Sequence, residues 1–295
     1  MKTLAVILFG IAVLTAHGAD LPPLNTPPTS DFYTGKFIWG DLFTDNPAAA
    51  EKFYTGLFGW QGSTVERSTP SGIHHYTVLS VGDRPIAGIA LRPARMKDEV
   101  HGKWVGYVSV PDVARAIAAA TAGGGHVFFP IKNFAHRGTQ AVFTDAEGAT
   151  LGVMHSSTGD PGEYLPGTGD WTWAELFARN PTAAGSYYGS VIGYDRLPDY
   201  RADQPNDLVL ASGGYSRAAV TAVSSRPKAH PAWLLFVRVA SVKDAARRAA
   251  SLGGRVLVPP SDVPSEYWRA VIADPSGAHI GLVELEDPKT PTEKP

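Results

Sequence analysis

The chain of 295 residues contains no cysteine, so it has no disulfide framework and no thiol to carry a lipid anchor behind a signal sequence. It also lacks an excess of charge of one sign. The 26 basic and 28 acidic residues give a formal net charge of −2, and the basic residues are scattered. The electrostatic footprint of a nucleic-acid-binding protein is therefore missing, and we expect no nucleic-acid partner.

Long apolar runs are missing too, apart from one near the start. Residues 4–14 are apolar and follow Lys2, and the small residues of the sequence Ala-His-Gly at 16–18 suit a cleavage site. This run of 11 residues is short for a bilayer, which needs about 20. Residues 1–18 are thus predicted to be a signal peptide, and the mature protein to be periplasmic or secreted and free of the membrane. A retained anchor is the alternative.

The composition, 44% hydrophobic and 18% charged, is that of a globular protein. The length suits two domains, each large enough to bury a core of its own. Behind the predicted signal, residues 19–34 are rich in proline and polar residues, which predicts a linker.

Two diverged copies of one module make up most of the remaining chain, at 35–157 and 169–286. Residues 158–168 link them, and a tail follows at 287–295. Early matches share an offset of 134 residues: Trp39 with Trp173, Leu42 with Leu176, and Asn46-Pro47 with Asn180-Pro181. Later matches share an offset of 129: His101 with His230, Trp104 with Trp233, Asp145 with Asp274, and Gly148 with Gly277. So many matches in register indicate a duplication.

Each copy shows the same order of expected elements. In copy one, a strand at 37–43 leads to a helix that Asn46 can cap, that Pro47 suits at its first position and that Gly59 can end. Strands are expected at 76–81 and 86–91. The pattern then recurs with a strand at 104–110, a helix at 112–122 and strands near 127, 141 and 151. Each copy is thus predicted to contain two βαβββ units, which gives an α+β fold.

This order, the sequence Leu-Phe-Gly-Trp at 57–60 and the Asp-x-x-Gly turns at 145–148 and 274–277 resemble the vicinal oxygen chelate superfamily. That superfamily includes glyoxalase I, bleomycin-resistance proteins and extradiol dioxygenases, and the likeness is greatest to tandem bacterial glyoxalase-like proteins. The resemblance implies that the two βαβββ units of each copy curl into a half-barrel around a cavity. It does not imply one reaction, because the superfamily hosts many.

Members of the superfamily that bind a metal hold it through the first, fifth and last strands of the domain. The resemblance places these positions at Trp39, Val105 and Gly152 in copy one, and at Trp173, Leu234 and Gly281 in copy two. None of these side chains can bind a divalent cation. The usual metal site, and with it any cofactor, is therefore predicted to be absent. A non-standard site formed by His279, Glu175 and His230 is the alternative.

Four polar residues are candidates for catalysis. Asp41 and Glu175 are equivalent in the two copies and share a strand face with the first-strand tryptophans, where burial would suit a carboxylate to general acid or base catalysis. The alternative is that each simply fixes its strand. His101 and His230 are also equivalent, and we expect them at the cavity rim as proton carriers or as ordinary loop histidines.

A third group of residues suggests ligand binding. Aromatic side chains recur at equivalent positions: Trp39, Trp173, Trp104, Trp233, Tyr54 and Tyr188. Ligand pockets are mostly apolar and aromatic. Gly152 and Gly281 would leave room for a ligand. The alternative is that the rings fill the half-barrels as core.

Three functions follow. The first is a metal-independent protein that binds a small apolar or aromatic molecule. The second is an enzyme, either a lyase or isomerase that uses Asp41 or Glu175, or a dioxygenase with an unusual metal set. The third is an interaction module with vestigial cavities, which could pair as a homodimer.

Overall fold

The computed structural model describes residues 21–69, 72–92, 101–198, 207–223, 230–260 and 268–285. The predicted signal peptide and C-terminal tail lie outside these ranges. None of the helices within them has the length and apolar character that crossing a membrane requires.

Copy one forms an eight-stranded sheet in the order β2-β3-β4-β1-β5-β8-β7-β6. Its elements are β1 (Phe37–Thr44), α1 (Pro47–Phe58), β2 (Gln61–Thr69), β3 (Gly72–Val81), β4 (Arg84–Leu91), β5 (Gly102–Ser109), α2 (Val113–Ala122), β6 (His126–Phe134), β7 (Gly138–Thr144) and β8 (Thr150–Ser156). The first strands of its two units, β1 and β5, are antiparallel neighbours at the centre. β4 and β8 flank them in parallel.

Copy two repeats this arrangement in the order β10-β11-β12-β9-β13-β16-β15-β14. Its elements are β9 (Trp171–Ala178), α3 (Pro181–Ile192), β10 (Asp195–Pro198), β11 (Leu208–Ser212), β12 (Tyr215–Ala222), β13 (Ala232–Arg238), α4 (Val242–Ser251), β14 (Arg255–Val258), β15 (Trp268–Ala273) and β16 (His279–Glu284). The duplication and the two βαβββ units of each copy are confirmed.

The first helix of each copy begins and ends as the sequence predicts. The Asn46 side chain accepts a hydrogen bond of 3.1 Å from a backbone N–H in the first turn of α1, and Pro47 follows it. Gly59 ends the helix with a φ of 71°, a left-handed conformation that costs glycine little. Asn180 and Gly193 do the same for α3.

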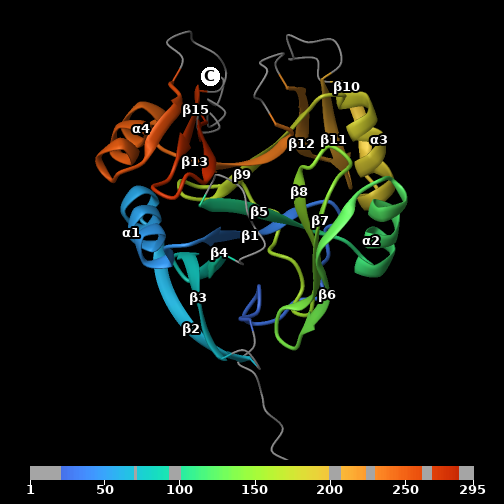
Figure 1. The fold of residues 1–295 in the computed structure, drawn as a ribbon, viewed down its shortest axis with the longest axis horizontal. Helices are drawn as coiled ribbons and strands as arrows, with labels where there is room; N and C mark the ends of the chain where they lie inside the picture. Colours follow the sequence, from blue (N-terminus) through green and yellow to red (C-terminus); the bar gives the residue numbers. More distant parts are fainter. Residues whose placement is uncertain are drawn as a thin grey trace, which may run out of the picture.

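The two sheets lie back to back, with α1 beside α4 and α2 beside α3 at the two sides (Figure 1). We call the side of each sheet that faces the other the helix face, and the opposite side the helix-free face. The two largest hydrophobic cores contain residues of both copies; one joins Leu151 and Val153 to Leu176 and Val220. Each copy also buries a smaller cluster of its own on its helix-free face. The central strands of one sheet are covered by the other sheet, with contacts between β5 and β13.

The segment predicted as a linker before copy one is packed against the protein in its described part, residues 21–34. Leu21 and Leu24 are 3% and 1% exposed and belong to a cluster on the helix-free face of the first sheet. The Asn25 amide donates hydrogen bonds to the carbonyls of three successive residues, 158–160. The segment thus covers the helix-free face of the first sheet, where a cavity was predicted. Its two leucines are buried by this contact.

Candidate functional site

Asp41 lies on the helix-free face of the first sheet and is 4% exposed. Trp39 shares that face because side chains alternate along β1, and its Nε1 donates a hydrogen bond of 2.8 Å to Asp41 Oδ1. The Tyr76 hydroxyl donates to the same oxygen at 2.6 Å. The pKa of Tyr76 is raised well above its ordinary value, mainly by burial and secondly by the negative charge of Asp41. The hydroxyl therefore stays protonated and remains a hydrogen-bond donor.

A buried arginine closes this face. The Arg137 side chain, from the turn between β6 and β7, is fully buried, and its guanidinium lies 4.0 Å from the centre of the Trp39 ring. Its Nε donates to the Pro22 carbonyl at 2.6 Å, whereas its two terminal nitrogens have no hydrogen-bond partner. Asp41 is therefore sealed beneath Arg137 and the N-terminal segment. A catalytic role for Asp41 stays a prediction.

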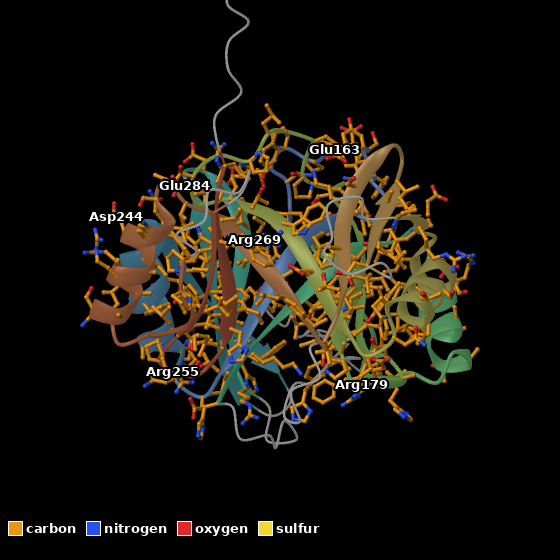
Figure 2. All side chains as sticks on the ribbon, turned by 90° about the horizontal axis from the view of Figure 1, so that it is seen from above. Glu163, Arg179, Asp244, Arg255, Arg269 and Glu284 are labelled. Carbon is orange, nitrogen blue, oxygen red and sulfur yellow. The ribbon has the colours of Figure 1, made fainter. Side chains whose placement is uncertain are left out.

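The equivalent carboxylate of copy two has different neighbours. Glu175 is also buried, but Thr221 Oγ1 donates to its Oε1 at 2.7 Å and Arg269 Nη1 to its Oε2 at 3.1 Å. The Arg269 side chain is 52% exposed and lies over the middle of the second sheet (Figure 2). Beside this pair is an apolar cluster of Leu234, Phe236 and Val283, against which Trp173 and Phe177 are only partly buried. The helix-free face of copy two thus combines a reachable guanidinium with aromatic rings.

Gly152 and Gly281 do not leave room for a ligand, contrary to expectation. A Cβ on Gly152 would lie 2.3 Å from the ring of Tyr107, its neighbour on β5. A Cβ on Gly281 would lie 2.2 Å from the ring of Phe236, its neighbour on β13. In each copy the space beside the glycine is filled by an aromatic ring of the next strand.

Trp104, Trp233, Tyr54 and Tyr188 were expected to line the half-barrel cavities, and this is also wrong. Trp104 belongs to a core between the two sheets, and Trp233 packs against the other shared core. The cause is strand alternation, because residue 104 points away from the face that residue 105 occupies.

The two tyrosines form reciprocal bonds between the copies. Trp104 Nε1 donates to the Tyr54 hydroxyl at 2.8 Å, which donates to Asp274 Oδ2 of copy two at 3.0 Å. In the same way Trp233 Nε1 donates to the Tyr188 hydroxyl at 2.9 Å, which donates to Asp145 Oδ2 of copy one at 2.9 Å. The repeated aromatic residues are thus parts of the joint between the copies.

The candidate histidines are exposed. His101 Nδ1 lies 2.8 Å from Asp45 Oδ2 at the surface, and His230 precedes β13. Within the residues that the structure describes, no three His, Cys, Asp or Glu side chains are placed to hold a metal, so His279, Glu175 and His230 do not converge.

The metal positions implied by the resemblance do not fit a cation either. Val105 and Leu234 offer no donor atom, the glycines have no side chain, and the indole of Trp39 donates a proton rather than an electron pair. Binding of a small molecule without a metal remains a prediction.

Sequence reasoning missed Tyr76, Arg137, Thr221 and Arg269. The registers of the two sheets make Gln140 the equivalent of Arg269, and Asp207 that of Tyr76. Because these residues differ between the copies, a search for repeated residues could not select them.

Two back-to-back sheets, each built from two βαβββ units with a carboxylate on its helix-free face, define a tandem α+β protein of the half-barrel type. Residues 30–153 match the family model of the glyoxalase/bleomycin resistance protein/dioxygenase superfamily, and residues 173–283 match that of a glyoxalase-like domain. The chain belongs to this superfamily, as a member with two tandem domains.

Relatives cover most of the chain. CFP32 of Mycobacterium tuberculosis, a candidate glyoxylase, is 29% identical over 258 residues, which are 88% of this chain and 98% of that protein. The anthracycline biosynthesis protein DnrV of Streptomyces peucetius is 28% identical over 267 residues, 87% of this chain and 95% of its own.

Solved structures share the fold. The 2,3-dioxygenase LapB of Pseudomonas sp. KL28 has a TM-score of 0.57 at 14% identity, over 90% of this chain and 96% of its own. The Mn(II)-bound glyoxalase of Novosphingobium aromaticivorans has a TM-score of 0.55 at 13% identity, over 89% and 86%.

Proposed function

We propose that the protein binds a small, flat aromatic molecule with a polar substituent on the helix-free face of its second sheet. One observation carries this proposal, namely the difference between the two equivalent faces. In copy one the carboxylate is covered by Arg137 and the N-terminal segment, with Leu24 1% exposed. In copy two the carboxylate pairs with Arg269, which is 52% exposed, beside the partly buried Trp173.

The chemistry of this face suits such a ligand. Binding sites are mostly apolar and aromatic with a few polar groups that fix orientation. Trp173 and Phe177 supply aromatic surface, and the Arg269 guanidinium can donate to an oxygen of the ligand while Glu175 holds it in place. The name of the relative DnrV supports an aromatic ligand, because anthracyclines are flat polycyclic compounds.

Binding at this face needs no metal, since Trp173, Leu234 and Gly281 present no ligand atoms. The chelator EDTA should therefore leave the affinity unchanged. Loss of binding after EDTA treatment, with recovery on adding a divalent cation, would contradict this part of the proposal.

The test is titration of the protein with 2-hydroxy-1,4-naphthoquinone, followed by tryptophan fluorescence and calorimetry. Arg269→Gln places the copy-one residue in copy two, and should weaken binding by about 10-fold or more, because a hydrogen bond from a charged donor contributes about 1.5–3 kcal/mol. Trp173→Leu should weaken it as well. Arg247→Gln is the matched control, because the side chain of Arg247 is 75% exposed on α4. Equal affinity in all four proteins would refute the site.

A further inference from the structure

A pocket of about 230 Å³ lies between the two copies; Trp173 of the second-sheet site is part of its lining, whereas Glu175 and Arg269 are not. Equivalent strand starts from both copies line it: residues 37–39 of β1 and 171–173 of β9, and residues 84–86 of β4 and 215–217 of β12. Residues of the linker between the copies, within 161–166, complete the lining. We call it the axial pocket, because equivalent residues of the two copies meet there.

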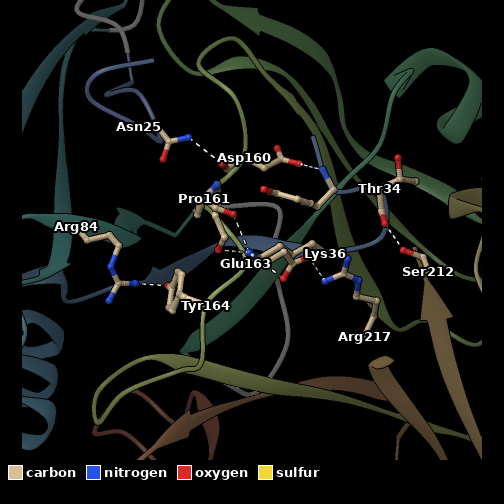
Figure 3. A network of polar contacts seen from close by, with 12 residues as sticks. Asn25, Thr34, Lys36, Arg84, Asp160, Pro161, Glu163, Tyr164, Ser212 and Arg217 are labelled. Atoms are coloured by element: carbon tan, nitrogen blue, oxygen red, sulfur yellow. Dashed lines mark hydrogen bonds and ion pairs between the residues drawn. The ribbon is translucent and has the colours of Figure 1, made fainter. Parts of the chain in front are cut away.

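Among the charged side chains that line the axial pocket, the cationic groups of Lys36, Arg84 and Arg217 outnumber the one carboxylate, that of Glu163. Lys36 and Arg217 share one carboxylate, that of Glu163, with Lys36 Nζ 3.4 Å from Oε2 and Arg217 Nη1 2.6 Å from Oε1 (Figure 3). Arg84 pairs with Asp170 at 2.7 Å. The carboxylates of Asp170 and Asp160, which interact with Arg84 and Lys36, are not part of the lining, so the lining itself carries three cationic groups and one anionic group.

Arg217 also has a donor without a partner. Its side chain is 8% exposed, and its Nε is buried and makes no hydrogen bond. A buried N–H without an acceptor costs about 1–3 kcal/mol. Because Nε has almost no accessible surface, an anionic oxygen in the axial pocket would remove this cost when the Arg217 side chain turns Nε towards it, and the charge of both partners would strengthen the hydrogen bond.

Lys36 holds the linker against the pocket. Its Nζ donates to the carbonyls of Pro161 and Gly162 at 2.7 and 2.6 Å. Its neighbour Tyr164 lies against Arg84, whose guanidinium is 4.5 Å from the centre of the ring. The linker therefore places an aromatic ring at the pocket.

The remaining wall is apolar. Phe37, Ile86, Trp171 and Leu235 line it, and the Trp171 indole is held by a hydrogen bond of 3.1 Å to the Ile86 carbonyl. A dry cavity of about 150 Å³ is enough to hold benzene, so the axial pocket has room for one ring and a small substituent.

We infer that the axial pocket is a second binding site, and that it takes a small monocyclic aromatic acid. The carboxylate of the ligand accepts from the Arg217 guanidinium, and its ring lies between Trp171 and Tyr164. This site shares Trp173 with the one proposed on the second sheet but does not use Glu175 or Arg269, so it does not rest on that proposal.

Calorimetry of the full chain with benzoate tests the inference. We expect benzoate to bind, and acetate and benzyl alcohol, which lack the ring or the charge, to bind at least 10-fold more weakly. Arg217→Met should weaken benzoate at least 10-fold, whereas the matched Arg269→Met should leave benzoate unchanged and weaken only the naphthoquinone. Tyr164→Leu should weaken benzoate too, and Tyr164 is 46% exposed, so the fold should tolerate the change.

Three outcomes would overturn the inference. The first is the absence of benzoate binding. The second is equal weakening by Arg217→Met and Arg269→Met, which would move benzoate to the second sheet. The third is equal affinity for acetate and benzoate, which would reduce the site to a simple anion contact. If Arg217→Met fails to fold, Tyr164→Leu is the test, and unchanged benzoate affinity in Tyr164→Leu would overturn the inference. Naphthoquinone binding reports separately on the function proposed for the second sheet.

Discussion

Removing one tyrosine hydroxyl at the joint between the copies should destabilise the whole chain. In Tyr54→Phe, the buried Nε1 of Trp104 loses its acceptor and Asp274 Oδ2 loses a donor. A hydrogen bond to a charged group contributes about 1.5–3 kcal/mol, and an unsatisfied buried N–H costs about 1–3 kcal/mol. Allowing for partial relaxation, we expect a loss of about 2–4 kcal/mol. Tyr188→Phe breaks the equivalent bonds of Trp233 and should cost a similar amount.

Urea unfolding followed by tryptophan fluorescence and by circular dichroism measures this loss. With a slope of about 3 kcal/mol per molar urea, a loss of 3 kcal/mol lowers the midpoint by about 1 M. Because the largest cores contain residues of both copies, each variant should lower a single shared transition. Tyr215→Phe is the control, since Tyr215 is 53% exposed.

Two results would refute this reasoning. One is a change below about 0.5 kcal/mol in both Tyr54→Phe and Tyr188→Phe, which is the range of ordinary surface substitutions. The other is a pair of separate transitions, of which each variant shifts only one. That pattern would mean that the copies unfold independently and that the shared cores contribute little.

Three further predictions concern packing and pH. Gly281→Ala should cost about 1–3 kcal/mol by pushing against the Phe236 ring, whereas Gly162→Ala, with open space around it, should cost little; thermal melting compares them. Leu24→Ala should cost about 2 kcal/mol or more in urea unfolding and increase binding of the dye ANS; a loss below about 0.5 kcal/mol would contradict this. Burial raises the pKa of Asp145 in the folded state, so the folded chain holds more protons than the unfolded chain between pH 3.8 and that raised value. Stability should therefore fall as pH rises through this window, and Asp145→Asn should flatten the slope; an unchanged slope would contradict it.

Local features of the fold were predictable because they depend on neighbours in the sequence. Asn46, Pro47 and Gly59 specify the ends of α1 through hydrogen bonds and backbone angles within a few residues. The duplication was visible for the same reason, since whole stretches recur in register. β2 was not located in advance, because Gln61–Thr69 is polar and shows no apolar alternation.

The packing between the copies was not predictable from such patterns. Periodicity shows that one face of an element is apolar, and it does not show what covers that face. Trp104 is an example, because its recurrence suggested a ligand site although its place next to Val105 put it on the other face of β5.

The candidate site was predicted only in part. The equivalence of Asp41 and Glu175 was readable from the offset of the copies, and both are buried on helix-free faces. Their different surroundings were not readable, because Arg137 and Arg269 come from other strands and turns, and the position equivalent to Arg269 is Gln140 in copy one.

The reciprocal hydrogen bonds of Tyr54 and Tyr188 join the helix faces of the two sheets, so substitutions are constrained differently on the two faces of each sheet. A substitution on a helix face must suit both halves at once, because that face meets its own counterpart across the joint. A substitution on a helix-free face concerns one half alone. The residues on the helix-free face of one half can therefore change while those of the other half stay as they are. The chain has the architecture of a symmetric dimer joined into one polypeptide, in which each helix-free face is independent of the other.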